Sequence, residues 1–297
     1  MKHTIRTVLF GLVSVLLVTG PAANAAFPGD NGVIAFTRFT HGQNDIWVVQ
    51  PDSTGTQRIT NTAHGNEAFP EWNATGTQIA FSKCGRSEFG NCEIWVMDAD
   101  GGNKTRLTHT PNNQETWPAW SPDGTQIAFT SDVSDPLQDI WVMDADGGNQ
   151  TQLTTTAGFD AFPEWSPDGS LIAFTSDRLA FDDIWVMEPD GQNPVRLTTG
   201  GNKIDERPDW SPDGSQITFS RNGNIWVIDA DGSSPTKLTD NPRNEFAPTF
   251  SPDGTKIAFD RERPVGRIGV WIMDADGTNA EQHTFRRLDF FPDWQPI

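Results

Sequence analysis

Short apolar segments alternate with turn-forming residues along almost the whole chain. Residues 160–199 resolve into DAFPEWS, then LIAFTS after the turn SPDG, then DIWVMEPDG, and finally PVRLT. β-Branched and aromatic residues are frequent in these segments, and none of the segments shows a helical period. Pro-Asp-Gly and Asp-x-Asp-Gly suit tight turns, because proline presets one backbone angle and glycine tolerates the other. The pattern predicts four short β-strands in each such unit.

Two series of aromatic residues show that this unit recurs at intervals of 40 to 48 residues. The first series, which precedes the Ser-Pro-Asp-Gly turn, is Trp72, Trp120, Trp165, Trp210, Phe250 and Trp294. The second series, inside segments similar to IWVMDADG, is Trp47, Trp95, Trp141, Trp185, Trp226 and Trp271. A four-stranded unit of this length is typical of a β-propeller blade. We therefore predict an all-β, six-bladed propeller in which these large apolar side chains fill the contacts between blades.

The repeat is incomplete at both ends of the chain. The segment NGVIAFTRF is a second strand without a first, and FPDWQPI is a first strand without a second. We expect the C-terminal segment to pair with the N-terminal sheet, since closure of the ring removes exposed strand edges. Residues 26–297 are then a single propeller domain.

Residues 1–25 have the features of an export signal. Lys2 and Arg6 precede an apolar run at 8–18, and Ala23 and Ala25 have the spacing that a signal peptidase reads. We expect the mature chain to be exported, to a periplasm or to the medium. No later stretch approaches the ~20 consecutive apolar residues of a membrane helix, so the sequence predicts no membrane span.

The net charge of the chain restricts the classes of molecule that it can bind. Formal net charge is −19, and it becomes −21 when the two basic residues of the expected signal are removed. Nucleic acid is excluded as a partner, whereas cations and basic protein surfaces are favoured. An acidic surface that only contacts water explains the charge equally well. We expect the protein to be a monomer.

Only two cysteines occur, in the segment KCGRSEFGNCEIW. Cys84 and Cys92 are separated by a short loop that contains glycines. In an oxidising compartment such a pair is typical of a disulfide rather than a metal site. We predict a disulfide that clamps one hairpin.

The segments WSPDGTQIAF and IWVMDADGGNQTQLT resemble the WD40-like repeat of the TolB family. The resemblance covers the propeller in six copies, with NATG at 73–76 in place of one Ser-Pro-Asp-Gly turn. It does not include the α/β domain that precedes the propeller in that family. The resemblance implies a binding scaffold whose channel and one rim accept a protein segment or another ligand, and it implies no reaction. A role in the Tol-Pal envelope system is a third alternative, which the lack of that domain disfavours.

Strand direction places the loops on two rims. The SPDG and DADG turns leave one face, which we call the turn rim. The loops between second and third strands and the loops between blades share the other face, which we call the variable rim and expect to carry function.

A carboxylate stands five residues before each aromatic of the first series, and we expect these carboxylates to ring the channel mouth at the variable rim. They are Glu67, Glu115, Asp160, Asp205, Glu245 and Asp289. A partial second ring, one residue before the aromatic, consists of Glu71, Glu164, Asp209 and Asp293. Such rings suit calcium or another divalent cation, or a basic peptide. The structural alternative is hydrogen bonding to neighbouring loops, and mutual repulsion predicts a counter-charge, an ion or raised pKa values.

Six of the 14 arginines of the mature chain gather in loops of the last two blades. They are Arg243, Arg261, Arg263, Arg267, Arg286 and Arg287. Arginine suits carboxylate, phosphate and sulfate, so this basic rim is a candidate site for an anionic glycan or an acidic protein. Local pairing with Asp260, Glu262 and Asp289 is the alternative.

The sequence contains fewer features that point to catalysis than features that point to binding. His41, His64, His109 and His283 lie in or beside loops of the variable rim and are candidate ligands of a transition metal, as in a secreted lyase or lactonase. The sequence has neither the spacing H-E-x-x-H nor a G-x-S-x-G or P-loop motif. The DADG turns do not match a calcium-binding EF-hand, because their glycine comes at the fourth position. We therefore favour a non-enzymatic binding scaffold, with a secreted metal-dependent propeller enzyme as the alternative.

Overall fold

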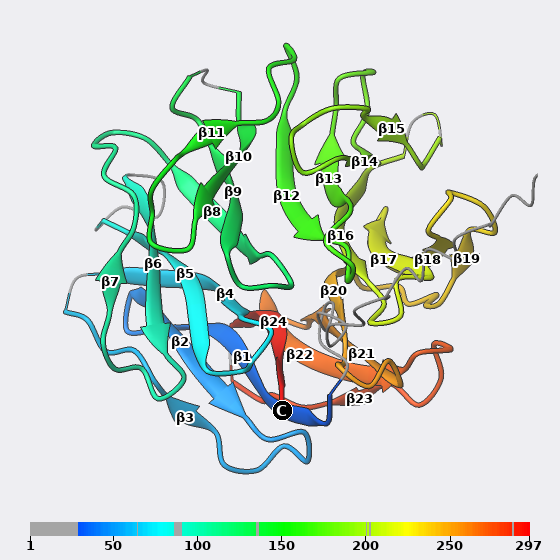
Figure 1. Ribbon diagram of the computed structural model, residues 1–297. Coiled ribbons are helices and arrows are strands. Elements are labelled where there is room, and N and C mark those ends of the chain that lie inside the picture. Colours follow the sequence, from blue (N-terminus) through cyan, green and yellow to red (C-terminus); the bar gives the residue numbers. More distant parts are fainter. Residues whose placement is uncertain are drawn as a thin grey trace, which may run out of the picture.

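The computed structural model describes residues 29–63, 65–85, 91–134, 137–199, 201, 203–286 and 288–297. These residues form six four-stranded antiparallel sheets around a central axis (Figure 1). The sequence prediction of a six-bladed propeller is confirmed. The expected export signal, residues 1–25, lies outside the described residues. Within them, no helix has the length and apolar character needed to cross a membrane.

Each blade begins with its innermost strand at the channel. Blade 1 contains β4 (Asn66–Trp72), β5 (Gln78–Cys84), β6 (Cys92–Asp98) and β7 (Thr105–Arg106). Blade 2 contains β8 (Glu115–Trp120), β9 (Gln126–Ser131), β10 (Asp139–Asp144) and β11 (Thr151–Gln152). Blade 3 contains β12 (Asp160–Trp165), β13 (Ile172–Ser176), β14 (Asp183–Met187) and β15 (Val195–Arg196). Blade 4 contains β16 (Asp205–Trp210), β17 (Gln216–Arg221), β18 (Asn224–Asp229) and β19 (Thr236–Lys237). Blade 5 contains β20 (Glu245–Phe250), β21 (Lys256–Arg263), β22 (Arg267–Asp274) and β23 (Glu281–Gln282).

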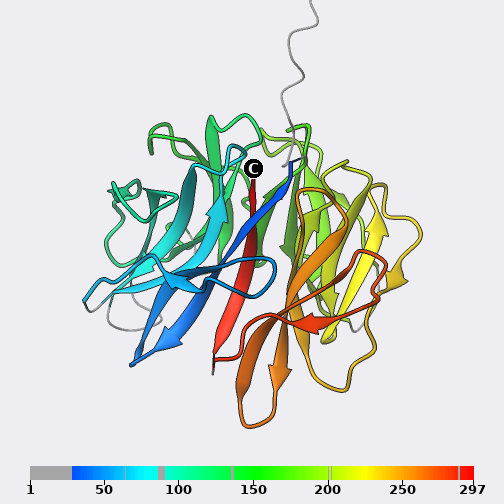
Figure 2. The same cartoon turned by 90° about the horizontal axis from the view of Figure 1, so that it is seen from below.

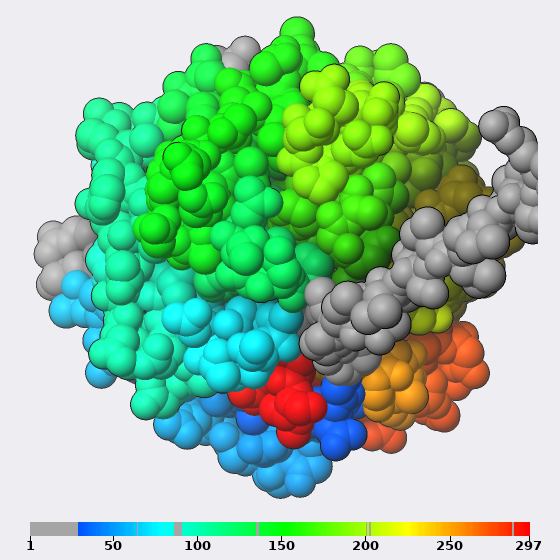
Figure 3. All heavy atoms as spheres, in the orientation of Figure 1, coloured from blue at the N-terminus to red at the C-terminus, as the bar shows by residue number. Residues whose placement is uncertain are grey.

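Blade 6 is assembled from the two ends of the chain. It contains β24 (Asp289–Pro296), β1 (Asn31–Thr40), β2 (Gln43–Val49) and β3 (Gln57–Arg58), in that spatial order. Trp294 pairs with Ile34 in the antiparallel register of β24 and β1. Figures 2 and 3 show the C-terminal segment (red) beside the N-terminal strand (blue). The predicted closure is therefore confirmed.

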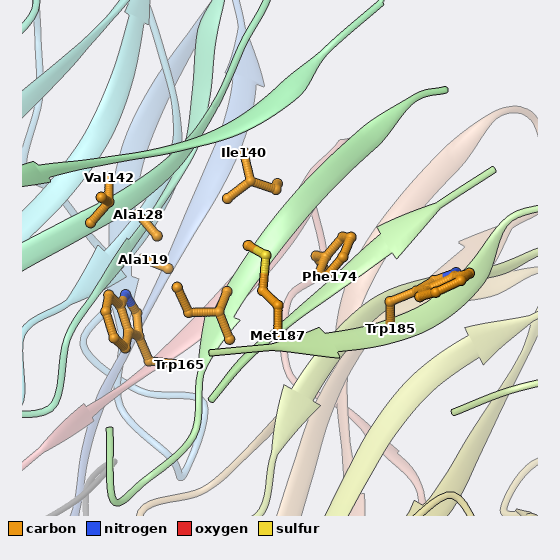
Figure 4. Packing of buried hydrophobic residues seen from close by; sticks show 9 residues of the cluster. Ala119, Ala128, Ile140, Val142, Trp165, Phe174, Trp185 and Met187 are labelled. Carbon is orange, nitrogen blue, oxygen red and sulfur yellow. The ribbon is translucent and has the colours of Figure 1, made fainter. Parts of the chain in front are cut away.

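Apolar side chains pack between neighbouring blades. One cluster joins Ala128 and Ile140 of blade 2 to Trp165, Phe174 and Met187 of blade 3 (Figure 4). The aromatic residues of the first series are all buried, with at most 8% of each exposed. A narrow sheet cannot cover both of its own faces, so burial against the next blade stabilises the ring.

The turns and the disulfide follow the sequence prediction. In the SPDG turn of blade 2, Asp123 Oδ1 accepts hydrogen bonds from the Ser121 hydroxyl at 2.7 Å and from the Thr125 N–H at 3.0 Å. Cys84 and Cys92 are bonded across the β5–β6 hairpin, with their Cα atoms 3.9 Å apart. The predicted clamp is confirmed.

A β-bulge interrupts the innermost strand of every blade. In blade 1 the bulge lies between Ala68 and Glu71, which pair with Ser82 and Ala80, so three steps along β4 match two along β5. The same shift occurs in the other blades. Side chains alternate between the faces of a regular strand, and one extra residue reverses that alternation. The bulge therefore decides which side chains face the channel.

Candidate functional site: the channel and its mouth

The six carboxylates expected to ring the channel mouth are buried beside it instead. Their side chains are 0–1% exposed. None of them lines the cavity of the channel. The expectation of an open ring is therefore corrected, and the cause is the bulge. Glu67 and Glu71 are four residues apart and would share a face of a regular strand, but the extra residue between them directs only Glu71 toward the channel.

Five of these carboxylates form ion pairs with arginine or lysine, which supply the counter-charge that the repulsion between carboxylates predicts. Four pairs join Asp205 to Arg221 at 2.5 Å, Glu245 to Arg261 at 2.5 Å, Asp289 to Arg38 at 2.5 Å and Asp160 to Arg178 at 3.0 Å. The fifth joins Glu67 to Lys83 at 3.4 Å.

Each of these cations also lies over a tryptophan of the second series, at 4.0 to 4.9 Å from the ring centroid. Such contacts are attractive because the ring face is negative. Carboxylate, cation and tryptophan thus form a repeated stack that stabilises each blade. Oxygen atoms engaged in this way are poorly placed to coordinate calcium.

Glu115 of blade 2 is the exception. Ser131 lies opposite it, where most other blades have arginine or lysine. Its Oε1 accepts a hydrogen bond from the Thr110 hydroxyl, and its Oε2 is buried without a partner among the described residues. Burial raises the pKa of Glu115 to about 7.

The channel mouth is formed by the residue two positions after each carboxylate. These residues are Phe69, Trp117, Phe162, Arg207, Ala247 and Phe291, and we call them the mouth ring. All six adopt φ between 49° and 59°. This left-handed conformation is unfavourable for residues other than glycine and often occurs at functional sites.

The aromatic rings of the mouth ring pack on one another and on Arg207. Phe69 stacks on Trp117 with centroids 3.8 Å apart. The guanidinium of Arg207 lies 4.4 Å from the centroid of Trp117 and 4.7 Å from those of Phe162 and Phe291. Burial lowers the pKa of Arg207 to about 10, so the side chain is still a cation at neutral pH.

Deeper in the channel lies the partial second ring of carboxylates. Glu71, Glu164, Asp209 and Asp293 line a cavity of about 90 Å³ together with the mouth ring and the prolines that follow it. Burial and the charge of the other carboxylates raise the pKa of Glu71 and Glu164 well above the ordinary value, and burial raises that of Asp293 to about 7. Asp293 Oδ2 accepts the N–H of Trp72 at 2.7 Å, so part of this ring is structural.

The arginines of the basic rim differ in their burial and in their partners. Arg261 belongs to the buried pair with Glu245, whereas Arg243, Arg267 and Arg286 are exposed. Arg263 is half-buried and donates a hydrogen bond from Nη1 to the carbonyl oxygen of Arg286 at 3.1 Å. Arg287 lies outside the described residues.

Two of the three acidic partners suggested for these arginines are engaged elsewhere. Asp289 pairs with Arg38, and Asp260 accepts the N–H of Phe291. Across the described ranges, no ion pair involves Arg243, Arg263 or Arg286.

His41, His109 and His283, which the structure describes, do not form a cluster. His41 lies at the β1–β2 turn and His109 is exposed after β7, both at the variable rim, and His64 lies outside the described residues. The ring of His283 contacts the Ser53 hydroxyl at 2.9 Å, beside the turn between β2 and β3 at the opposite rim. In the part of the chain that the structure describes, no group of three or more His, Cys, Asp or Glu side chains has the arrangement of a metal site.

The sequence analysis missed the mouth ring. A signal was present, because every member precedes a proline: the pairs are Phe-Pro, Trp-Pro, Phe-Pro, Arg-Pro, Ala-Pro and Phe-Pro. A residue before proline avoids the right-handed helical region. That preference alone does not show which side chain enters a channel.

Comparison with known proteins agrees with this architecture. The model of the TolB beta propeller domain matches residues 14–138, 133–224 and 203–296. A search of curated proteins finds no match.

Solved structures with similar folds include TolB from Acinetobacter baumannii, at 23% identity and a TM-score of 0.79 over 91% of this chain and 68% of that one. A putative TolB from Agrobacterium tumefaciens is 22% identical, with a TM-score of 0.71 over 90% of this chain and 91% of that one. Oligogalacturonate lyase from Vibrio parahaemolyticus is 15% identical, with a TM-score of 0.56 over 80% of this chain and 74% of that one. At these identities the structural likeness concerns the fold alone. The family match spans most of the described propeller, and the chain therefore belongs to the TolB β-propeller family.

Proposed function

We propose that this chain is an exported, non-enzymatic binding scaffold that holds a segment of a protein partner at the mouth of its channel. The mouth ring is the observation that carries this proposal. It presents four aromatic side chains and one arginine on strained backbone at one end of a rigid ring of sheets. Aromatic residues and arginine are enriched in protein interfaces and contribute most to binding.

Two further features support the proposal. The exposed arginines Arg243, Arg267 and Arg286 lie at the same rim and extend the contact surface for an anionic part of the partner. The Cys84–Cys92 disulfide fits an oxidising compartment outside the cytoplasm. The rival proposal of a metal-dependent enzyme needs a cluster of metal ligands, and the described residues contain none.

Selection from a random peptide library tests the proposal. The mature chain is immobilised, retained peptides are synthesised, and their dissociation constants are measured by calorimetry. We expect Trp117→Ala, which removes half of the stacked pair with Phe69, to weaken binding at least tenfold, or by about 1.4 kcal/mol.

Val195→Ala is the matched control, because Val195 is 54% exposed on the outermost strand of blade 3 and far from the channel. It should leave the affinity unchanged. Peptides that bind the Trp117→Ala variant as tightly as the parent chain, while both proteins show the same thermal unfolding, would contradict binding at the channel mouth.

A further inference from the structure

Blade 4 has a shorter hairpin at the variable rim than the other blades. Phe219 of β17 pairs with Trp226 of β18, seven positions further along the chain, whereas the corresponding residues of the other blades are 11 to 14 positions apart. Asn222-Gly223 joins the two strands, and this sequence favours a two-residue turn because both positions adopt φ > 0. The β21–β22 hairpin of blade 5 (orange) projects further at this rim (Figure 2). The short turn of blade 4 therefore leaves a hollow beside it.

This hollow is a pocket of about 300 Å³ next to the channel. Three segments line it: the turn Asn222-Gly223, Ile204 and Glu206 around the start of β16, and Asn244 and Phe246 around the start of β20. Arg207 lines both this pocket and the cavity of the channel, so the two spaces adjoin. We call the hollow the blade 4 pocket.

Hydrogen bonds tie the walls of the blade 4 pocket to its turn. Asn222 Oδ1 accepts the N–H of Ile204 at 3.1 Å, and the N–H of Asn222 donates to the carbonyl oxygen of Ile204 at 3.2 Å. The carbonyl oxygen of Gly223 accepts the N–H of Glu245 at 3.0 Å. The pocket is therefore preformed, and a ligand does not have to order it on binding.

The blade 4 pocket combines apolar walls with accessible polar groups that have no partner. Ile204 is 49% exposed, and Phe246 is half-buried. The side-chain amide of Asn244 is exposed and the carboxylate of Glu206 is half-buried. Neither group forms a hydrogen bond or an ion pair within the described part of the chain. A ligand with an apolar part and a polar end would match both kinds of surface.

The charge around the pocket is negative. Glu245 is paired with Arg261 at 2.5 Å, but among the described residues no ion pair involves Glu206 or the neighbouring Asp182. Burial and the negative charge of Glu206 raise the pKa of Asp182 to about 6, so these two carboxylates repel each other. Arg207 offsets only part of this charge, because its guanidinium lies 4.4 to 4.7 Å from the centroids of three aromatic rings of the mouth ring. A further cation would relieve the repulsion.

We propose that the blade 4 pocket binds a basic side chain, lysine or arginine, of the partner segment that occupies the channel mouth. The apolar stem of this side chain packs on Ile204 and Phe246, and its cation lies against the carboxylate of Glu206 and the amide oxygen of Asn244. An acidic residue is repelled here, and an apolar residue leaves the negative charge uncompensated. Arg243, the member of the basic rim nearest in sequence, does not line the pocket. This inference rests on the proposed function and specifies one residue of the partner.

A single amino acid tests the pocket without any selected peptide. N-acetyl-lysine methylamide is titrated into the isotopically labelled mature chain, and the side-chain amide signals of Asn222 and Asn244 are followed by NMR spectroscopy. We expect these signals to shift in the parent chain and not in Glu206→Gln, which keeps the size of the side chain. Glu281→Gln is the matched control and should shift as the parent does, because Glu281 is exposed on the outermost strand of blade 5.

Three results of this titration would overturn the inference. The first is an absence of shifts in the parent chain, and the second is shifts that persist in Glu206→Gln. The third is equal shifts caused by glucose or by N-acetyl-norleucine methylamide, which has the apolar stem without the ammonium group. Such shifts would show that the pocket does not recognise the cation.

The peptides retained in the selection give a second measurement. We expect them to contain a lysine or arginine whose replacement by norleucine weakens binding to the parent chain about fivefold, the upper end for a partly exposed ion pair. The same replacement should have no further effect on Glu206→Gln, which is the signature of a direct contact in a double-mutant cycle. Retained peptides that bind Glu206→Gln as tightly as the parent would overturn this inference alone. Lysine-induced shifts without any retained peptide would instead contradict the proposed function.

Discussion

Glu115 faces Ser131 across the first two strands of blade 2, at the position where four other blades place arginine or lysine opposite a carboxylate. In blade 3 the facing residue is also a serine, Ser176, but Arg178 reaches back to Asp160. Blade 2 alone lacks this cation among the described residues. Its carboxylate stack is therefore incomplete, and its stability should depend on pH.

Supplying the missing cation should stabilise the protein. Ser131→Arg places a guanidinium opposite Glu115, as Arg221 lies opposite Asp205 in blade 4. We expect a gain of roughly 1 kcal/mol in the free energy of unfolding at pH 8, discounted for partial solvent screening. Thermal unfolding measures it, and Ser131→Gln, which adds length without charge, should give no such gain.

The pH dependence of Glu115 has a defined sign. Its pKa is raised from 4.5 to about 7, so the folded protein keeps a proton that the unfolded chain loses across this range. The free energy of unfolding should therefore fall as pH rises from about 4.5 to 7. Glu115→Gln should reduce this slope and be most stabilising, relative to the parent, at pH 8. An unchanged slope in the variant would contradict the raised pKa.

The carboxylates inside the channel should also make the free energy of unfolding fall as the pH rises. Burial raises the pKa of Glu164 and Asp209 well above their ordinary values. Each such group destabilises the folded state once it ionises. Glu164→Gln should raise the thermal unfolding temperature at pH 8 and leave it nearly unchanged at pH 4. Denaturation followed at both pH values checks this, and an equal effect at the two would refute it.

Removing the cation from a complete stack of carboxylate, cation and tryptophan should lower the free energy of unfolding by more than the missing cation of blade 2 does. Arg221→Met leaves Asp205 buried without its cation, and we expect a loss of about 3–5 kcal/mol. Adding Asp205→Asn removes the buried charge and should recover most of that loss. Urea denaturation of the single and double variants gives both values. A double variant no more stable than Arg221→Met would show that packing on Trp226 outweighs the charge.

Closure of the ring depends on the last strand. Trp294 is 3% exposed and packs with Ile34, Phe36 and Ala258 between blades 5 and 6. Trp294→Ala should therefore lower the free energy of unfolding by about 3–5 kcal/mol. Phe285→Ala is the control, because Phe285 is 66% exposed and its loss should change stability by less than about 0.5 kcal/mol. Similar stability of the two variants would contradict a closed ring.

The blades could be predicted from the amino-acid sequence. Turn chemistry and the spacing of tryptophans are local signals, and they were sufficient for six sheets, their strand order and the junction of β24 with β1. The Cys84–Cys92 disulfide followed from the two cysteines and the short loop between them. The repeated carboxylates also indicated that counter-charges, an ion or raised pKa values would be needed. The sequence did not show which cations these would be, and one of them, the partner Arg38 of Asp289, is brought close only when the ends of the chain meet.

Which side chains face the channel became clear only from the packing of the blades. Glu67 and Glu71 carry the same charge at the same place in the repeat, yet one is buried in an ion pair and the other lines the cavity. The bulge at Phe69 separates them, and the N–H of that residue donates to the hydroxyl of Thr37 in the preceding blade. The bulge, an irregularity in the pairing of two strands, thus sets the direction of a side chain within one strand. The amino-acid pattern of that strand does not contain this information.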